Sequence, residues 1–120
     1  MSATTWTLNI PGWHPNPLNK IMGHWGKTHK LKSKDRAVIT SACMAYGVEK
    51  AIGKRRVDLL IVYPKGKRSH DKDAWWKSLG DALVCCGALR DDTKNYVELG
   101  SVEYAKGEVL RTLITLTDLD

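Results

Sequence analysis

The sequence has no phenylalanine, few cysteines and no long apolar run. None of its apolar stretches approaches the ~20 residues of a membrane-spanning helix, so we expect no membrane span. The three cysteines, Cys43, Cys85 and Cys86, are odd in number and lack the spaced pairs of a disulfide framework or of a four-ligand zinc site. The N-terminus also lacks the basic and apolar regions of a signal peptide. These absences predict a cytoplasmic protein whose thiols are reduced and buried.

Acidic residues are absent from the first 34 positions, which carry Lys20, Lys27, Lys30, Lys32 and Lys34. Over the whole chain, 19 Lys and Arg face 13 Asp and Glu, and this net charge of +6 favours an acidic partner. Because many proteins with no such partner are also basic, the total alone is weak support. The 120 residues, of which 42% are hydrophobic, predict one globular domain over 1–120.

Two kinds of periodicity run along the chain. Alternation of apolar and polar residues predicts strands, and apolar residues three and four apart predict helices. The expected elements are a strand over 4–10, a helix over 33–51, a strand over 57–63, a helix over 72–86, and strands over 95–104 and 108–117 that form a hairpin at Gly107. The order β-α-β-α-β-β predicts an α+β fold, a two-layer sandwich in which two helices cover one face of a mixed sheet of about four strands.

The segment 11–32 shows no periodicity and is expected to be a long loop, which in a small domain is usually functional or disordered. Trp13 and Trp25 would either stack on unpaired bases or pin the loop to the core, and the two interpretations are equally supported. His24 and His29 would contact phosphate or have no specific role.

Aspartates are unusually dense between positions 71 and 92, and a basic run precedes them. The aspartates are Asp71, Asp73, Asp81, Asp91 and Asp92, and the basic run is Lys65, Lys67, Arg68 and His70. Carboxylates this close repel one another unless a cation lies among them, and Mg²⁺ binds through carboxylates, water and phosphate oxygens. A simpler interpretation is that Asp71 caps a helix and that Lys77 forms an i,i+4 ion pair with Asp73.

If the turn at Asp92 meets Asp71 and Asp73, their carboxylates would hold one divalent ion. That ion would bind a phosphate oxygen and acidify a water molecule, while Lys77 would hold the scissile phosphate as a point charge. His70, next to Asp71, would contact phosphate or support the metal site. The pattern therefore indicates metal-dependent chemistry on a nucleic-acid backbone.

An ordered set of residues fills positions 71–92: Asp71-Lys-Asp73, Lys77, Asp81-Ala-Leu83, Gly87 and Asp91-Asp92. Its spacing resembles the D-x-D…K…DAL…G…DD pattern of the RusA family of Holliday junction resolvases, which bacteria and phages encode. The chain departs from the family at Ala74, where an asparagine is frequent, and in the pair Trp75-Trp76.

The resemblance implies an endonuclease that uses Mg²⁺, or Mn²⁺ in its place, to resolve four-way DNA junctions by paired symmetric nicks in recombination and repair. It also implies a homodimer that works in the bacterial or host cytoplasm. By correspondence, the metal ligands would be Asp71, Asp73 and Asp92 and the essential lysine Lys77, with Asp91 in a supporting position. We expect phosphate contacts from the basic segments, through Lys20, Lys27, Lys30, Lys32, Lys34, Lys65, Lys67 and Arg68.

Two other functions stay open. In the first, the chain is a non-catalytic module that binds branched nucleic acid, although all three expected ligands and the lysine are retained. In the second, it is a metal-independent ribonuclease that uses His24 or His29. Activity that survives EDTA would favour the ribonuclease.

Overall fold

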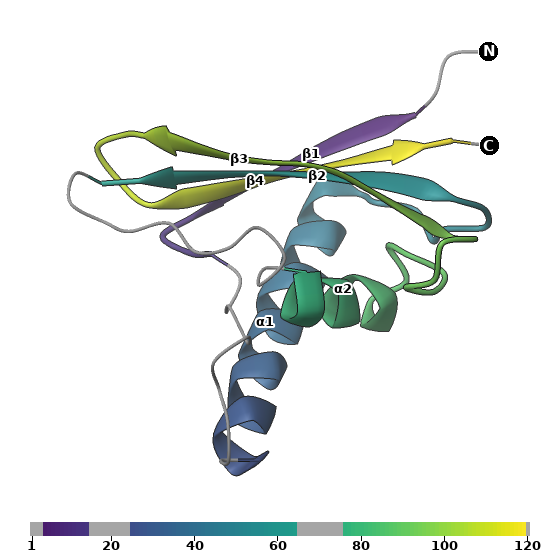
Figure 1. Cartoon of the computed structure of the whole chain (residues 1–120), viewed down its shortest axis with the longest axis horizontal. Coiled ribbons are helices and arrows are strands. Elements are labelled where there is room, and N and C mark those ends of the chain that lie inside the picture. The colour runs from purple at the N-terminus through teal and green to yellow at the C-terminus, as the bar shows by residue number, and fades with distance from the viewer. Residues whose placement is uncertain (1–3, 15–24, 65–75, 120) are drawn as a thin grey trace.

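The computed structural model describes residues 4–14, 25–64 and 76–119, with backbone alone for 25–33, 77 and 78. Its elements are β1 (Thr5–Pro11), α1 (Trp25–Tyr46), β2 (Arg55–Tyr63), α2 (Trp76–Cys85), β3 (Val97–Lys106) and β4 (Arg111–Asp118). The four strands form one mixed sheet, and both helices lie against the same face of it (Figure 1). The expected α+β fold with the order β-α-β-α-β-β is therefore confirmed. None of the described helices is long and apolar enough to cross a membrane.

The sheet has the strand order β1-β4-β2-β3. β4 runs antiparallel to both of its neighbours, and β3 runs parallel to β2. The strand with the most apolar sequence, β2, lies between two partners, as expected for a strand buried on its inner face. Its residues Val57, Leu59 and Ile61 are each at most 1% exposed.

The expected hairpin between the last two strands is wrong. β3 and β4 pair with opposite edges of β2, so the link between them crosses the end of that strand. The amide of Gly107 donates a hydrogen bond to the carbonyl of Tyr63 (2.9 Å), and a Cβ atom at Gly107 would lie 2.5 Å from Cγ1 of Val62. Any side chain at position 107 would force Val62 to move, because the link passes close over β2, and no hairpin turn is involved.

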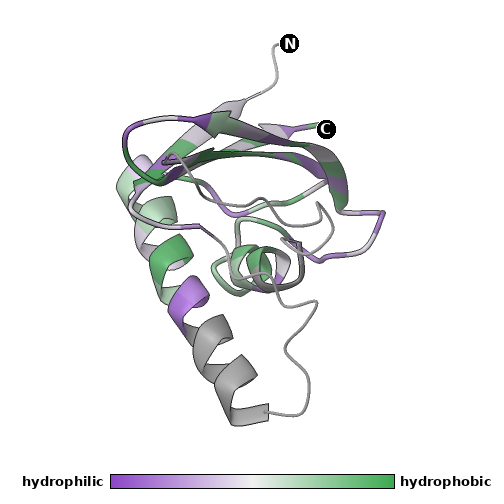
Figure 2. Ribbon diagram, turned by 60° about the vertical axis from the view of Figure 1, so that its left-hand side comes forward, coloured by the Kyte–Doolittle hydropathy of each residue, from purple (hydrophilic) through white to green (hydrophobic). Residues whose placement is uncertain are grey.

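The core lies between the sheet and the two helices, where hydrophobic residues gather (Figure 2). Leu8 and Ile114 from the sheet, Ile39 from α1, and Leu79 and Leu83 from α2 are all fully buried. Removing these side chains from water is the main favourable term for so small a domain. α2 thus packs by the apolar face that its sequence predicts.

The boundaries expected for the first helix, 33–51, are wrong at both ends. α1 already includes Trp25, so the lysines expected in a loop at 27, 30 and 32 lie on helical backbone. Lysine has a high helix propensity, but this stretch lacks the apolar periodicity that reveals a core-facing helix. At the other end, Gly47 adopts a φ of 67°, and the amide of Val48 donates to the carbonyl of Cys43 (2.9 Å). Gly47 therefore ends the helix as a left-handed cap.

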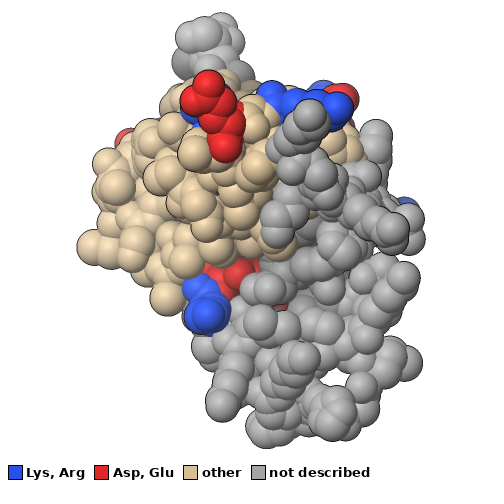
Figure 3. Space-filling model, turned by 90° about the vertical axis from the view of Figure 1, so that its left-hand side faces the viewer, with Lys and Arg blue, Asp and Glu red and all other residues tan. Residues whose placement is uncertain are grey.

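The surface that Figure 3 presents is the end of the sheet where β2 and β3 finish. In its described part, Lys and Arg residues lie in small groups beside Asp and Glu, and most of the surface is uncharged. The described residues of this face form no continuous basic patch.

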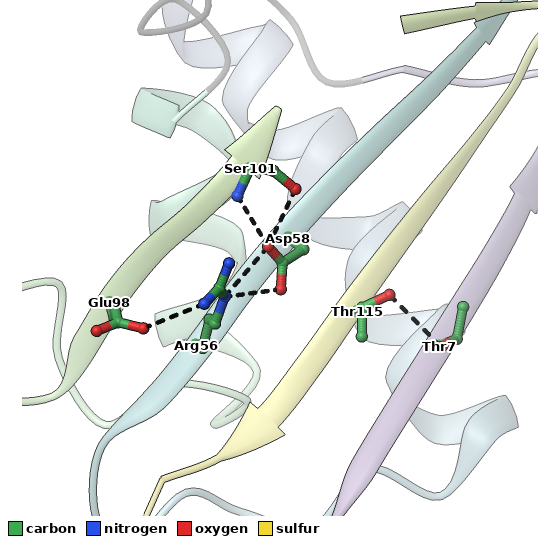
Figure 4. A network of polar contacts seen from close by, with 6 residues as sticks. All are labelled: Thr7, Arg56, Asp58, Glu98, Ser101 and Thr115. Carbon is green, nitrogen blue, oxygen red and sulfur yellow. Dashed lines mark hydrogen bonds and ion pairs between the residues drawn. The ribbon is translucent and has the colours of Figure 1, made fainter. Parts of the chain in front are cut away.

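A β-bulge interrupts the pairing of β2 with β3. Val57 pairs with Leu99 but Leu59 pairs with Val102, so β3 has one extra residue. The carboxylate of Asp58, on the outer face of the sheet, accepts hydrogen bonds from the amide (2.8 Å) and hydroxyl (3.1 Å) of Ser101 (Figure 4). The side chain of Asp58 thus accepts a hydrogen bond from the backbone amide of Ser101 at the bulge.

Two charged neighbours extend this arrangement. Nε of Arg56 donates to Asp58 (3.1 Å), and Nη1 of Arg56 lies 3.7 Å from a Glu98 carboxylate oxygen. Burial raises the pKa of Asp58, but the hydrogen bonds from Ser101 and Arg56 outweigh it, so the pKa of Asp58 is lowered overall. The ionised carboxylate therefore stabilises the folded state.

Replacing this carboxylate by an amide, Asp58→Asn, is expected to lower the free energy of unfolding at pH 7 by about 1 kcal/mol. A lowered folded pKa gives stability that is present above the ordinary value of about 3.9 and is lost as pH falls through the folded value. The difference between wild type and variant should therefore shrink on acidification, as measured by urea denaturation at pH 7 and near pH 2.5. The control is Glu98→Gln, which removes the exposed outer partner and should cost less than about 0.5 kcal/mol. A constant difference at both pH values would contradict this account.

Candidate active site

A hollow of about 220 Å³ opens between α2, the loop that follows it, and the sheet. Its walls are mainly apolar and include Val57 of β2, Trp76, Gly80 and Leu83 of α2, Leu99 of β3, and Asp92 of the loop. Asp92 is exposed and is the one carboxylate among the described lining residues. The arrangement is a mostly apolar depression with a single anionic group at its edge.

The loop over 86–96 is held in place by its own buried residues. Ala88 and Leu89 are each 2% exposed, and the amide of Leu89 donates to the carbonyl of Leu83 (3.1 Å). The guanidinium of Arg90 lies 5.1 Å from the centre of the Tyr96 ring and donates to the carbonyl of Ile52 (3.1 Å). These contacts fix both ends of the turn that carries the two adjacent aspartates.

Within that turn, the two aspartates have different roles. Oδ1 of Asp91 accepts a hydrogen bond from the amide of Asp92 (2.7 Å), so Asp91 shapes the backbone. The side chain of Asp92 is the one that lines the hollow. The carboxylate of Asp91 is thus engaged within the turn, whereas Asp92 faces the space beside α2.

Much of the predicted site lies outside the described residues. The range 15–24 contains Lys20 and His24. The range 65–75 contains Lys65, Lys67, Arg68, His70, Asp71 and Asp73. Lys77 lies in the first turn of α2, and Lys27, Lys30, Lys32 and His29 lie on α1, with backbone alone described. Asp81, on α2, is half-buried, and Lys34, on α1, is exposed.

The described residues by themselves make no metal centre. Among them, no three His, Cys, Asp or Glu side chains come together as metal ligands. Asp92 is therefore the described member of the predicted ligand set, and the other two members precede α2 in the chain. The convergence of the three carboxylates stays a prediction.

A second hollow, of about 280 Å³, contains an acid that the sequence analysis did not single out. Asp35 of α1 is fully buried and lines this hollow with Trp13, His14 and Lys34. The sequence does mark Asp35 as unusual, because it is the first acidic residue of the chain and lies within a lysine-rich stretch. Its side chain is inside the fold, and burial of a carboxylate is costly without polar neighbours.

Three aromatic rings gather where β2 ends. The ring of Tyr63 lies 6.2 Å from that of His14 and stacks at 6.1 Å on that of Tyr104. Burial, with a smaller effect of Tyr104, raises the pKa of Tyr63 to about 12. The Tyr63 hydroxyl is buried and has no hydrogen-bond partner among the described residues. Tyr63 is followed by Pro64 and then by the predicted basic segment, so this cluster adjoins it in the chain.

Trp13 contributes to the fold as well as to the second hollow. It packs against the core as a partly buried side chain, and its carbonyl accepts a hydrogen bond from the hydroxyl of Thr112 (2.5 Å). Of the two interpretations for the early tryptophans, pinning the chain to the core is confirmed for Trp13. Trp25 is the first described residue of α1, and its side chain is not described.

Comparisons with known proteins give a limited result. No protein-family model matches the sequence, and no curated protein matches it either. A structure titled as the HypE–HypF complex aligns with a TM-score of 0.44 and 11% identity, over 97% of this chain and 32% of that one. Thiamine monophosphate kinase from Aquifex aeolicus aligns with a TM-score of 0.43 and 15% identity, over 96% of this chain and 32% of the kinase. The complex of AaThiL with AMPPCP and TMP gives the same score and identity, over 96% and 30%. The chain spans about a third of the length of each.

Proposed function

We propose that the chain is a Mg²⁺-dependent endonuclease of the RusA type, which cuts four-way DNA junctions as a homodimer. The observation that carries the proposal is that Asp92 and Trp76 line one hollow. Asp73 precedes Trp76 by three residues, and three residues span at most about 11 Å of chain. The exposed carboxylate of Asp92 therefore faces the part of the molecule to which the Asp71-Lys-Asp73 segment is covalently tied.

The donor set fits the expected ion. Three carboxylates are hard oxygen ligands, which suit Mg²⁺ or Mn²⁺ better than softer metals. When bound, the ion would polarise the scissile phosphate and lower the pKa of a water molecule. Asp92 would hold the ion from the loop after α2, together with Asp71 and Asp73. Lys77, in the first turn of α2, follows Trp76 directly and would neutralise charge on the phosphate.

The helical backbone at 25–34 supports phosphate binding. Lys27, Lys30 and Lys34 are three and four residues apart, so they lie on one face of α1. A row of cations along a helix tracks a phosphate backbone without reading sequence. Because each neutralised phosphate releases counterions, binding should weaken steeply as salt is raised. A four-way junction has near two-fold symmetry, which a symmetric dimer with two such faces would match.

The proposal is tested with a labelled four-way junction in Mg²⁺, in Mn²⁺ and in EDTA. Wild-type protein should place paired symmetric nicks only when the metal is present. Asp71→Asn should still bind the junction but not cut it, because an amide is a poorer ligand for a hard cation. Circular dichroism of the variant serves as the control for folding.

Two outcomes would overturn the proposal in favour of the alternatives. Cleavage that persists in EDTA would point to the metal-independent ribonuclease that uses His24 or His29. Tight junction binding with no cleavage in either metal would point to the non-catalytic module.

A further inference from the structure

Two of the three cysteines meet between the helices. Cys43 lies near the C-terminal end of α1, and Cys86 follows α2 directly. Their Sγ atoms are 3.5 Å apart, although 43 positions separate them in the sequence. Cys43 is 6% exposed and Cys86 is half-buried, whereas Cys85 is exposed. The contact therefore joins a buried cysteine to a half-buried one.

The surroundings make the two sulfurs unequal. The hydrogen bond with Cys43, opposed by burial and helped by the backbone amides of Ala88 and Cys86, lowers the pKa of Cys86 to about 6. The same contact and burial raise the pKa of Cys43, with the charge of Arg55 acting in the other direction. These opposite shifts favour Cys86 over Cys43 as the attacking thiolate, although the Cys86 thiol also lies within hydrogen-bond distance of the Leu83 carbonyl (3.4 Å).

We propose that Cys43 and Cys86 are a redox-active dithiol, which a low-molecular-weight disulfide such as oxidised glutathione converts into a disulfide that links α1 to the end of α2. The bond requires the sulfurs to move from 3.5 Å to about 2.05 Å. Such a shift is within the reach of small side-chain rotations. The proposal is independent of the nuclease proposal, since none of the residues involved belongs to the predicted metal site.

The chemistry proceeds by two exchanges. The Cys86 thiolate attacks one sulfur of oxidised glutathione, forms a mixed disulfide and releases one glutathione thiolate. Cys43 gives its proton to a glutathione thiolate and attacks Sγ of Cys86, which expels the second glutathione. Overall, the two protein thiols are oxidised to one disulfide, and one glutathione disulfide is reduced to two thiols.

Cys85→Ser provides the background for the test, because trypsin does not separate Cys85 from Cys86. The full chain in this background is incubated in glutathione buffers of rising oxidation and quenched with acid. We expect a loss of about 2 Da, from the two thiol protons, and a cross-link between the tryptic peptides over 37–50 and 78–90. The oxidised form should melt on the order of 10 °C higher than the reduced form, because the bond closes a long loop.

Cys43→Ser in the same background is the matched variant. It should retain one glutathione on Cys86 and show no cross-link and no such rise in melting temperature. The proposal would be overturned if folded Cys85→Ser protein formed no bond between residues 43 and 86 under oxidising conditions. It would also be overturned if wild-type protein formed its disulfide through Cys85, either with Cys86 or between two chains.

Discussion

Replacing Arg55 by methionine is expected to lower the free energy of unfolding by about 3–5 kcal/mol, the range for breaking a buried, hydrogen-bonded ion pair. Arg55 is 2% exposed. Its Nε donates to the Oδ1 of Asp118 (2.7 Å), and its Nη1 donates to the carbonyls of Glu49 (2.8 Å) and Ala88 (2.9 Å). Its guanidinium also lies 4.5 Å from the ring centre of Trp6.

These contacts connect four parts of the fold. Arg55 begins β2, Asp118 ends β4, Glu49 belongs to the link after α1, and Ala88 to the loop after α2. Methionine keeps the apolar stem of the side chain but leaves the buried carbonyl of Ala88 and the part-buried carbonyl of Glu49 without this donor. Asp118 keeps some access to water, with 34% of its side chain exposed, so the loss should fall toward the lower end of the range. Urea denaturation monitored by tryptophan fluorescence measures it.

The neighbouring arginine provides the control. Arg56 lies on the outer face of the sheet, is 45% exposed in its side chain, and pairs with Asp58 and Glu98. Arg56→Met should cost less than about 1 kcal/mol, because exposed ion pairs contribute little. Equal losses for the two variants would show that burial and the backbone acceptors do not set the strength of the Arg55 contacts.

The sheet and the core helix could be predicted because their sequences carry a strong local signal. Alternation of apolar and polar residues marked β1, a largely apolar run marked β2, and apolar residues at helical spacing marked α2. The pairing of the last two strands could not be predicted in this way, because a turn signal between strands does not say which neighbour each strand takes. A glycine at position 107 fits a tight hairpin as well as a link that passes close to Val62, so the residue type does not distinguish the two connections.

The first half of α1 shows a different limit. Its sequence is rich in lysine and has no apolar stripe, so the hydrophobic pattern that reveals helices is absent. At the other end, the expected helix runs past Gly47 to position 51, whereas the positive φ of Gly47 makes it the cap. Helix ends depend on single backbone conformations, which residue preferences alone do not fix.

Of the predicted site, the aspartate pair at 91–92 was correctly placed in a turn after α2. The sequence could not separate the two residues, since both are exposed acids at adjacent positions. The structure separates them by the hydrogen bond from the amide of Asp92 to the carboxylate of Asp91. The apolar walls of the hollow, formed in part by Trp76 and Leu99, also depend on packing between distant segments.

Asp92→Asn is expected to reduce the rate of cleavage of a four-way junction in Mg²⁺ by at least about a hundredfold. A metal ion contributes several kcal/mol of transition-state stabilisation, and each ~1.36 kcal/mol corresponds to a tenfold change in rate. The side chain is exposed, and the hydrogen bond in the turn uses the amide of residue 92 and not its carboxylate. The free energy of unfolding should therefore change by less than about 0.5 kcal/mol. Junction affinity in the absence of metal should not fall.

The decisive measurement is the dependence of the cleavage rate on Mg²⁺ concentration. If Asp92 holds the ion, the residual activity of the variant should need at least about tenfold more Mg²⁺ for half-saturation, since metal sites weaken by 10- to 100-fold even when supporting groups are lost. Glu103→Gln is the matched control. Glu103 is an exposed residue of β3 and follows the inward-facing Val102, so its carboxylate lies on the face of the sheet away from the hollow. It should cut like wild type. An Asp92→Asn protein that cuts normally while Asp71→Asn is inactive would show that the third ligand lies elsewhere. Loss of rate with an unchanged Mg²⁺ requirement would assign Asp92 to DNA or fold instead of the ion.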